Sequence, residues 1–412
     1  MVKVVLDDAA GATPGGIPYE SEIFDPRSIN STRIVLTAEI LEGPFAGEIE
    51  RTVWTGSFKA NGVGTVDRWE ASVLGQRHYT LEFDPAIRTA HLFDDFAAAF
   101  TAGIDYTGNR FANLLEGGGG NDHLDGGGGS DALRGFRGAD TLIGGGGNDD
   151  LDGGRGRDSM AGGSGNDLYR VSLAEGDSVV ERADGGHDTI VLLDGWGYYM
   201  PDNVEDVRVE TETSPGANVI GNDLDNVMRQ AAMGGPLSGA CGDDLLIGAE
   251  GGDSLYGDEG NDEVRGAGGS DHVAGGAGRD LLLGGGGDDT VEGYTGNDRM
   301  DGGNGADWLT GGTGRDTMTG GGGEDRFTFY EAAESGASLA ARDTITDFVS
   351  GLDRFQIFFA SDFIGNVDFS GSAGELNYRN GTLRADVDGD GLADFSLTLR
   401  GAPNLASGDL EL

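Results

Sequence analysis

The segment GGGGNDHLD, residues 117–125, opens a nine-residue repeat that decides the fold of this chain. Six consecutive units run from residue 117 to residue 170, and ten more run from GACGDDLLI at 239–247 to residue 328. In all sixteen units Gly occupies positions one and four, Asp occupies position six, and an apolar residue occupies position eight. A fixed period of this kind indicates a repeat architecture and outweighs local secondary-structure propensity.

The spacing within one unit predicts a turn followed by a short strand. Glycines at positions one, two and four permit positive φ angles without steric cost, so the first six residues can form a tight turn. The last three residues are too few for a helix but sufficient for a strand, and each strand places one apolar side chain inside. Two units then form one coil of a flattened solenoid, with turns alternating between its two edges. We therefore predict an all-β fold.

The position-six aspartates should stack along each edge, one coil apart, and no basic residue recurs beside them. Because stacked carboxylates repel one another, a cation must lie between them. A cage of carboxylate and turn carbonyl oxygens suits a hard cation such as Ca²⁺, whereas zinc and copper prefer Cys or His ligands. The predicted metal-binding aspartates are Asp122, Asp131, Asp140, Asp149, Asp158, Asp167, Asp244, Asp253, Asp262, Asp271, Asp280, Asp289, Asp298, Asp307, Asp316 and Asp325.

This unit resembles the RTX nonapeptide repeat, which folds as a parallel β-roll and binds Ca²⁺. The resemblance implies that each ion lies between turns on the same edge, so that Asp122 pairs with Asp140 and the others pair at the same spacing. It implies two parallel β-roll arrays with about four plus eight sites, or about twelve Ca²⁺ ions. The glycines predicted to complete the cages are Gly117, Gly126, Gly144, Gly153, Gly275, Gly284, Gly302 and Gly311. Turns with another residue at position two are expected to be weaker sites, as at Phe136, Ala249, Asp258, Ala267 and Tyr294.

The chain is strongly acidic, with 72 Asp and Glu residues against 27 Lys and Arg residues and a net charge of −45. Self-repulsion should expand the metal-free chain, and metal binding should supply much of the folding free energy. Without Ca²⁺ we expect the Gly-rich arrays to be disordered. The charge balance argues against nucleic acid and anionic membrane surfaces as partners, because both require clustered Lys and Arg.

Cysteine content and the terminal segments bear on where the protein acts. The single cysteine, Cys241, excludes an intrachain disulfide. Residues 1–16 lack the apolar core of a signal peptide, and no transmembrane stretch of 18 apolar residues occurs. Cytosolic calcium is too low for weak cages, and RTX proteins leave through a one-step type I exporter that uses an uncleaved C-terminal signal. The resemblance therefore implies a secreted, extracellular or cell-surface protein, with the type I exporter as a partner during secretion.

Residues 1–107 are predicted to form a small β-rich domain behind a loose N-terminal arm. Strands are expected at 32–41, 48–58, 64–74, 77–83 and 86–93, and a short helix at 94–103.

No catalytic residue is predicted in this domain. His78 and His91 belong to no H-E-x-x-H motif, and no G-x-S-x-G, Walker or Rossmann pattern occurs in the chain. Trp54 and Trp69 are expected in the core, although an exposed Trp could stack on a sugar ring. We therefore favour a non-catalytic module, and two alternatives stay open for residues 1–107. One is a small glycan-active enzyme, and the other is an adhesin that binds a glycan or a surface partner.

The rest of the chain is predicted to have four parts: a first array at 108–170, a connecting segment at 171–238, a second array at 239–328 and a cap at 329–412. Degenerate units with Asn in the Asp place precede each array, through Asn113 and Asn226. The connecting segment is expected to contain longer strands.

The cap, residues 329–412, contains motifs at 343–348, 351–357, 371–378 and 385–399 whose order resembles the C-terminal cap of serralysin-type secreted metalloproteases. This resemblance implies a β cap that closes the roll and contains the export signal, but no protease, because the zinc-binding helix is absent. Glu411 departs from the apolar ending that such signals often have. The run from Asp386 to Asp394 begins like an EF-hand loop but has Leu397 at the twelfth place, which leaves a weak calcium loop and a plain hairpin turn as alternatives.

Overall fold

The computed structural model describes residues 103, 105–183, 185–210, 217–231, 235–401 and 403–412, together with the backbone of six strands within residues 7–81. The chain divides into two units, Met1–Asp188 and Thr189–Leu412. The described residues form strands and two short 3-10 turns, η3 (Ala332–Glu334) and η4 (Ser407–Asp409). The predicted all-β fold class is therefore confirmed.

The N-terminal strands form one antiparallel sheet in the order β1-β6-β5-β4-β3-β2. They are β1 (Asp7–Asp8), β2 (Glu22–Phe24), β3 (Arg33–Ala38), β4 (Thr52–Ser57), β5 (Trp69–Val73) and β6 (Arg77–Leu81). Strands β3 to β6 lie within four of the predicted strands. The expected strand at 86–93, residues 94–102 of the expected helix, and the side chains of Trp54, Trp69, His78 and His91 lie outside the described residues.

The first array consists of two stacks of parallel strands, because successive nine-residue units alternate between the two sides of the coil. One stack contains β7 (Asp105–Asn109), β9 (His123–Gly127), β11 (Thr141–Gly146), β13 (Ser159–Ser164) and β15 (Ser178–Val179). The other contains β8 (Leu114–Gly118), β10 (Ala132–Phe136), β12 (Asp150–Asp152) and β14 (Leu168–Ser172). Partners within the repeats are 18 residues apart, as Leu124 and Leu142 are, which is the predicted two units per coil.

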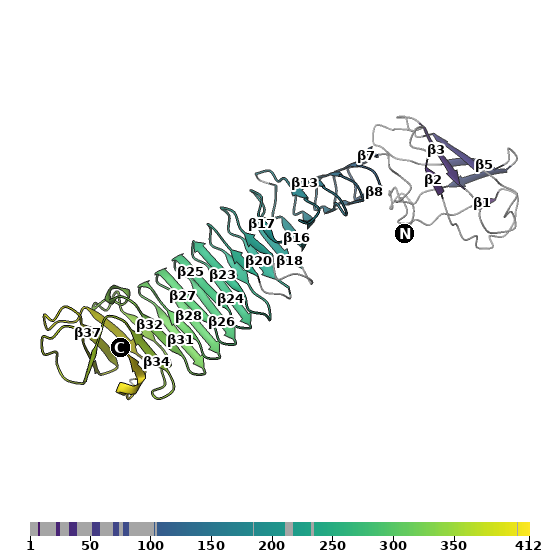
Figure 1. Cartoon of the computed structure of the whole chain (residues 1–412). Coiled ribbons are helices and arrows are strands. Elements are labelled where there is room, and N and C mark those ends of the chain that lie inside the picture. Colours follow the sequence, from purple (N-terminus) through teal and green to yellow (C-terminus); the bar gives the residue numbers. More distant parts are fainter. Residues whose placement is uncertain are drawn as a thin grey trace. The chain divides into compact units, whose positions relative to one another are not determined.

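The second unit repeats this arrangement, and Figure 1 shows its strands stacked coil upon coil. One stack contains β16 (Thr189–Asp194), β18 (Asp206–Val209), β20 (Val227–Gln230), β22 (Leu245–Ile247), β24 (Glu263–Gly268), β26 (Leu281–Gly286), β28 (Arg299–Asn304), β31 (Thr317–Gly322) and β33 (Asp343–Ile345). The other contains β17 (Gly197–Tyr199), β19 (Asn218–Ile220), β21 (Pro236–Ser238), β23 (Ser254–Glu259), β25 (His272–Gly278), β27 (Thr290–Gly296), β29 (Trp308–Thr310), β32 (Arg326–Phe329), β34 (Arg354–Ile357) and β39 (Leu410–Glu411), with β30 (Thr313–Gly314) beside β27.

The stacks extend beyond the residues that carry the clear repeat. Strands β16 to β21 lie in residues 171–238 and pair in parallel like the repeat strands, as β18 does with β20. The unit boundary after Asp188 also falls inside this segment. In residues 329–412, β33 and β34 continue the two stacks. The remaining cap strands are β35 (Asp362–Gly365), β36 (Glu375–Arg379), β37 (Thr382–Asp386) and β38 (Phe395–Leu399).

The core of each array consists of the side chains at position eight, one from each strand of the two stacks. All sixteen are fully buried: Leu124, Leu133, Leu142, Leu151, Met160, Tyr169, Leu246, Leu255, Val264, Val273, Leu282, Val291, Met300, Leu309, Met318 and Phe327. Burial of one such side chain contributes about 2 kcal/mol, and ordering the backbone of nine residues opposes folding by considerably more. So thin a core needs a further source of cohesion, and the turns contain it.

Candidate metal centre

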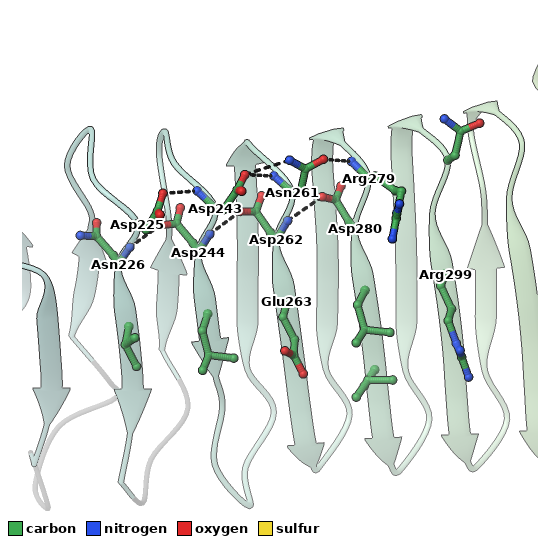
Figure 2. A pocket seen from close by; sticks show the side chains of 15 residues that line it. Asp225, Asn226, Asp243, Asp244, Asn261, Asp262, Glu263, Arg279, Asp280 and Arg299 are labelled. Atoms are coloured by element: carbon green, nitrogen blue, oxygen red, sulfur yellow. Dashed lines mark hydrogen bonds between the residues drawn. The ribbon is translucent and has the colours of Figure 1, made fainter.

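The position-six aspartates form a hydrogen-bonded ladder along each edge. In twelve of the sixteen units the backbone N–H of this Asp donates to Oδ1 of the Asp 18 residues later, at 2.7 Å from Asp122 to Asp140 and at 2.9 Å from Asp262 to Asp280. Figure 2 shows part of one ladder, from Asn226 through Asp244 to Asp280. All twelve predicted pairs are brought together in this way.

The second carboxylate oxygen has no protein partner in most of these turns. Oδ2 is buried without a hydrogen bond in Asp131, Asp140, Asp149, Asp158, Asp167, Asp244, Asp262, Asp271, Asp280, Asp289, Asp298, Asp307 and Asp316. A buried, unpartnered charged oxygen costs free energy, and its regular recurrence needs an explanation. A cation between successive turns supplies one, because it would ligate this oxygen.

Burial raises the pKa of these carboxyls, and neighbouring carboxylates add to the effect. The pKa rises to about 7 for Asp140, through burial and then through the charges of Asp122 and Asp158. The pKa of Asp298 also rises to about 7 because of burial and the charges of Asp316 and Asp280. Burial and repulsion therefore disfavour the ionised form of these carboxyls. A divalent cation between them would favour the ionised form instead.

The glycines at position one make room for the cage. A Cβ added to Gly117 would collide with Oδ2 of Asp122 and would lie 2.8 Å from the carbonyl oxygen of Gly135 in the next coil. The same carboxylate contact occurs at all eight predicted glycines, including Gly284 with Asp289. Carboxylate and carbonyl oxygens therefore converge between successive turns, and an all-oxygen donor set of this kind fits Ca²⁺.

Position two adopts a left-handed backbone in most turns, whatever residue occupies it. The φ angle is 71° at Phe136, 73° at Asp258, 77° at Ala267 and 67° at Tyr294. Ala240, a further departure that the sequence analysis missed, has a φ of 77°. A non-Gly residue there is strained, because its Cβ crowds the backbone.

The turns at the ends of the ladders differ from the interior ones. In the turn of Asp122, the N–H of Gly118 donates to Oδ2 at 2.7 Å, and Ala249 does the same for Asp253. In the degenerate unit before the first array, the N–H of Asn109 likewise donates to the side-chain oxygen of Asn113, at 2.8 Å. These carboxylate or amide oxygens are already occupied by protein donors. The first turn of each edge is therefore closed on itself, whereas interior turns leave Oδ2 available.

An outer ladder at position five was not anticipated from the sequence. The N–H of Asp243 donates to Oδ1 of Asp225 at 2.8 Å, and the N–H of Asn261 donates to Oδ1 of Asp243 at 2.8 Å (Figure 2). These bonds run back toward the preceding coil, whereas the bonds of the inner ladder run forward. With strand side chains such as Leu245 and Arg299, the two ladders line a groove of about 1080 Å³.

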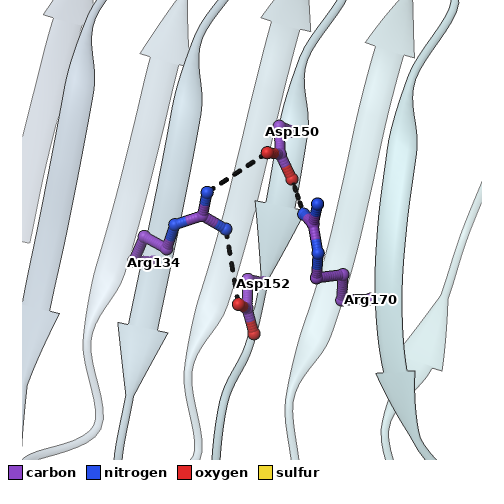
Figure 3. Close-up of polar contacts among 4 residues, drawn as sticks. All are labelled: Arg134, Asp150, Asp152 and Arg170. Carbon is purple, nitrogen blue, oxygen red and sulfur yellow. Dashed lines mark hydrogen bonds and ion pairs between the residues drawn. The ribbon is translucent and has the colours of Figure 1, made fainter. Parts of the chain in front are cut away.

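On the outer face of the first array, ion pairs link neighbouring strands instead of occupying the turns. Arg134 contacts Asp150 at 3.2 Å and Asp152 at 3.3 Å, and Arg170 pairs with Asp150 (Figure 3). These side chains lie at positions seven and nine of their units, away from the cages. The basic residues of this face therefore do not neutralise the stacked turn aspartates.

The acidic run of the cap lies in the loop between the antiparallel strands β37 and β38. Oxygens of Asp386, Asp388 and Asp394 lie within 4.8 Å of one another. Both oxygens of Asp386 accept backbone N–H groups of this loop, from Gly389 and Gly391. The hairpin is therefore present, and calcium binding by the loop stays a prediction.

Buried carboxylates and converging carbonyls, repeated from coil to coil, define a cation-binding parallel β-roll. A sequence model described as "RTX calcium-binding nonapeptide repeat (4 copies)" matches residues 107–135, 134–169, 239–273, 265–300 and 301–329. Over these residues the chain thus consists of RTX calcium-binding nonapeptide repeats.

Two solved structures are similar to parts of the chain. The AlgE6R3 subunit of the mannuronan C5-epimerase of Azotobacter vinelandii has 31% sequence identity and a TM-score of 0.16, covering 34% of this chain and 77% of that one. Extracellular lipase LipA from Serratia marcescens has 16% identity and a TM-score of 0.21, covering 55% of this chain and 45% of that one. No curated protein matches the chain. Among the described residues, no helix has the length and apolar character needed to cross a membrane.

Proposed function

We propose that the protein is a secreted RTX protein whose arrays fold when about twelve Ca²⁺ ions enter the cages between stacked turns. The buried, unpartnered Oδ2 atoms of the aspartate ladders carry this proposal. In the low calcium of the cytosol the ladders repel, so the chain stays unfolded and can pass through a type I exporter. Calcium outside the cell then fills the cages and folds it.

The proposed role is that of a non-catalytic extracellular or cell-surface module. The residues of the arrays support this role, because the Asp and Gly residues that recur in every unit form the ladders and the turns. Residues 1–107 are the proposed place of a glycan or surface partner. The resemblance of residues 329–412 to a serralysin-type cap supports the export route.

A calcium titration of the full chain followed by circular dichroism tests the proposal. We expect weak strand signal in EDTA and a cooperative gain as Ca²⁺ is added, since the ladders cannot close without the ion. Mg²⁺ at the same concentrations should have little effect, because it demands a smaller octahedral site and keeps its waters. Full strand signal in EDTA would contradict the proposal.

A further inference from the structure

The first cap strand, β33, continues the ladder edge of the second array although it lies outside the repeats. β33 pairs with β31 in parallel, with Thr344 beside Thr317 and Ile345 beside Met318. The array strands β28 and β31 pair in the same register. Asp343, the first residue of β33, therefore takes the place that Asp316 has next to β31, which is the position of a ladder aspartate.

The turn that leads to Asp343 lacks the glycine pattern of the repeats. Ser335 forms a parallel bridge with Gly314, just as Gly314 pairs with Gly296 one coil earlier, so Ser335 takes the place of the position-four Gly. Residues 336–342 then form an excursion before Asp343, closed by a bond from the N–H of Gly336 to the carbonyl of Ala341 at 2.7 Å. The N–H of Asp343 donates to Oγ of Ser335 at 2.9 Å, which fixes the carboxylate at the turn.

Asp316 and Asp343 reproduce the contacts of an interior ladder pair. The N–H of Asp316 donates to Oδ1 of Asp343 at 2.7 Å. Both side chains are fully buried, and Oδ2 of each has no hydrogen-bond partner. Two buried carboxylate oxygens at one turn thus remain unsatisfied by the protein, as in the arrays.

This feature distinguishes Asp343 from Asp353, the other ladder end of the second unit. Asp353 ends the ladder on the opposite edge, and its Oδ2 accepts the N–H of Val349 at 2.7 Å, which closes that turn on itself. In the turn that leads to Asp343, the corresponding N–H belongs to Tyr330. It donates to the carboxylate of Glu334, at 3.0 Å, and not to Asp343. Oδ2 of Asp343 is left free for another ligand.

Glu334 also brings a third negative charge to this place. It is 8% exposed, and its charge acts on both Asp316 and Asp343. Three acidic groups therefore lie at one buried turn where the cap joins the array, and their mutual repulsion is unfavourable without a cation. The charge count of a cage is also one of the determinants of its calcium affinity.

We propose that Asp316 and Asp343 hold a further Ca²⁺ ion that joins the cap to the second array, with Glu334 strengthening the site by its charge. The site rests on the proposed function, and it adds a ligand that neither the repeat pattern nor the matched residues contain. The ion would also order the cap hairpin, because Asp343 pairs with Leu397 of β38 and Ser335 donates to the carbonyl of Ser396 at 2.6 Å.

The test compares the full-length protein with its Asp343→Asn variant. Bound Ca²⁺ is counted by equilibrium dialysis, and hydrogen exchange is followed during a calcium titration. We expect the variant to bind one ion fewer. Amides of 343–345 and 395–399 should lose at least ten-fold of their calcium-dependent protection, while array amides before residue 300 keep theirs. The matched control is Asp368→Asn, because that carboxylate is 87% exposed and pairs only with Arg379 among the described residues.

The outcomes separate this inference from the proposed function. An array that takes up no Ca²⁺ in the unmodified protein contradicts the proposed function. An array that responds normally, with an unchanged ion count and unchanged cap protection in Asp343→Asn, overturns the cap site alone.

If Asp343→Asn leaves the cap unfolded at every calcium concentration, Glu334→Gln decides. That variant keeps both proposed ligands and removes only the added charge. The calcium midpoint for cap protection should rise several-fold, and an equal midpoint would overturn the inference.

Discussion

The hydroxyl of Tyr169 donates a hydrogen bond to the carboxylate of Glu181 inside the first array. Tyr169 fills the last apolar position of that array and is fully buried. The N–H of Gly162 donates to the Tyr169 hydroxyl at 2.6 Å and to Glu181 at 2.9 Å. The last core position of the first array is thus a tyrosine, and its hydroxyl contacts residues 171–188, which follow the glycine-rich repeats.

Removal of this hydroxyl should destabilise the first array. Tyr169→Phe keeps the ring but withdraws a donor from the carboxylate of Glu181, so we expect a loss of about 1–3 kcal/mol in the free energy of unfolding. The measurement is urea unfolding in saturating Ca²⁺. Tyr294→Phe is the control, because Tyr294 is 52% exposed and its hydroxyl donates to Glu292 at the surface. Equal losses in both variants would contradict the assigned role of Tyr169.

Two glycines of one turn should respond differently to Ala substitution. A Cβ on Gly284 would lie 2.5 Å from the carbonyl oxygen of Gly302 and 2.6 Å from Oδ2 of Asp289, whereas a Cβ on Gly286 meets nothing closer than 3.9 Å. We expect Gly284→Ala to raise the calcium midpoint at least ten-fold. Gly286→Ala should be neutral, or stabilising by about 0.5 kcal/mol. The midpoints are measured by circular dichroism, and a silent Gly284→Ala would show that position one does not border the cage.

Interior and terminal aspartates should differ in the number of ions that depend on them. Asp280 contacts Asp262 on one side and Asp298 on the other, and its Oδ2 is unpartnered. Asp122 begins its edge, and its Oδ2 accepts the N–H of Gly118. Asp280→Asn should therefore abolish about two sites and Asp122→Asn at most one, at two turns per cage. Ion counts by equilibrium dialysis check this, and equal counts would argue against sharing between neighbouring turns.

The metal-free fold should be favoured by acid. The pKa of Asp140 is raised to about 7 by burial, so the folded, metal-free protein binds more protons than the unfolded chain at mildly acidic pH. The stabilising contribution is fully present below the usual Asp pKa of about 4 and is lost as the pH rises through about 6 to 7. We expect the strand signal in EDTA to increase when the pH is lowered from 7 to 5. The same signal at both values would contradict the raised pKa values.

Much of the fold follows from the repeat, because Asp at position six and an apolar residue at position eight fix both the ladder and the core. Residues 171–238 lack the glycine period, yet strands such as β18 and β20 pair in the array register. Hydrophobic alternation alone could not tell a stacked coil from a separate connection. The bounds of the five predicted parts of the chain and the export signal remain predictions.

The cap ladder shows where the sequence pattern is insufficient. Asp343 lies 18 residues after Asp325, so the period predicts that these two pair. In the structure Asp343 pairs with Asp316, and Asp325 donates instead to Asp353 at 3.2 Å. Asp316 and its partner are 27 residues apart instead of 18, chiefly because the excursion at 336–342 lengthens the turn, and the later partners are shifted with it. The spacing predicts the position of a residue within its nine-residue unit, but it does not predict which coil that residue lies in.

The central claim is that Ca²⁺ lies between stacked aspartate turns, and diffraction from calcium-saturated crystals tests it most directly. We predict anomalous peaks along both edges of each array, including one between Asp262 and Asp280, with oxygen ligands at about 2.3–2.6 Å. Turns that contain only water, or Oδ2 atoms bonded to the protein instead of to an ion, would contradict the account.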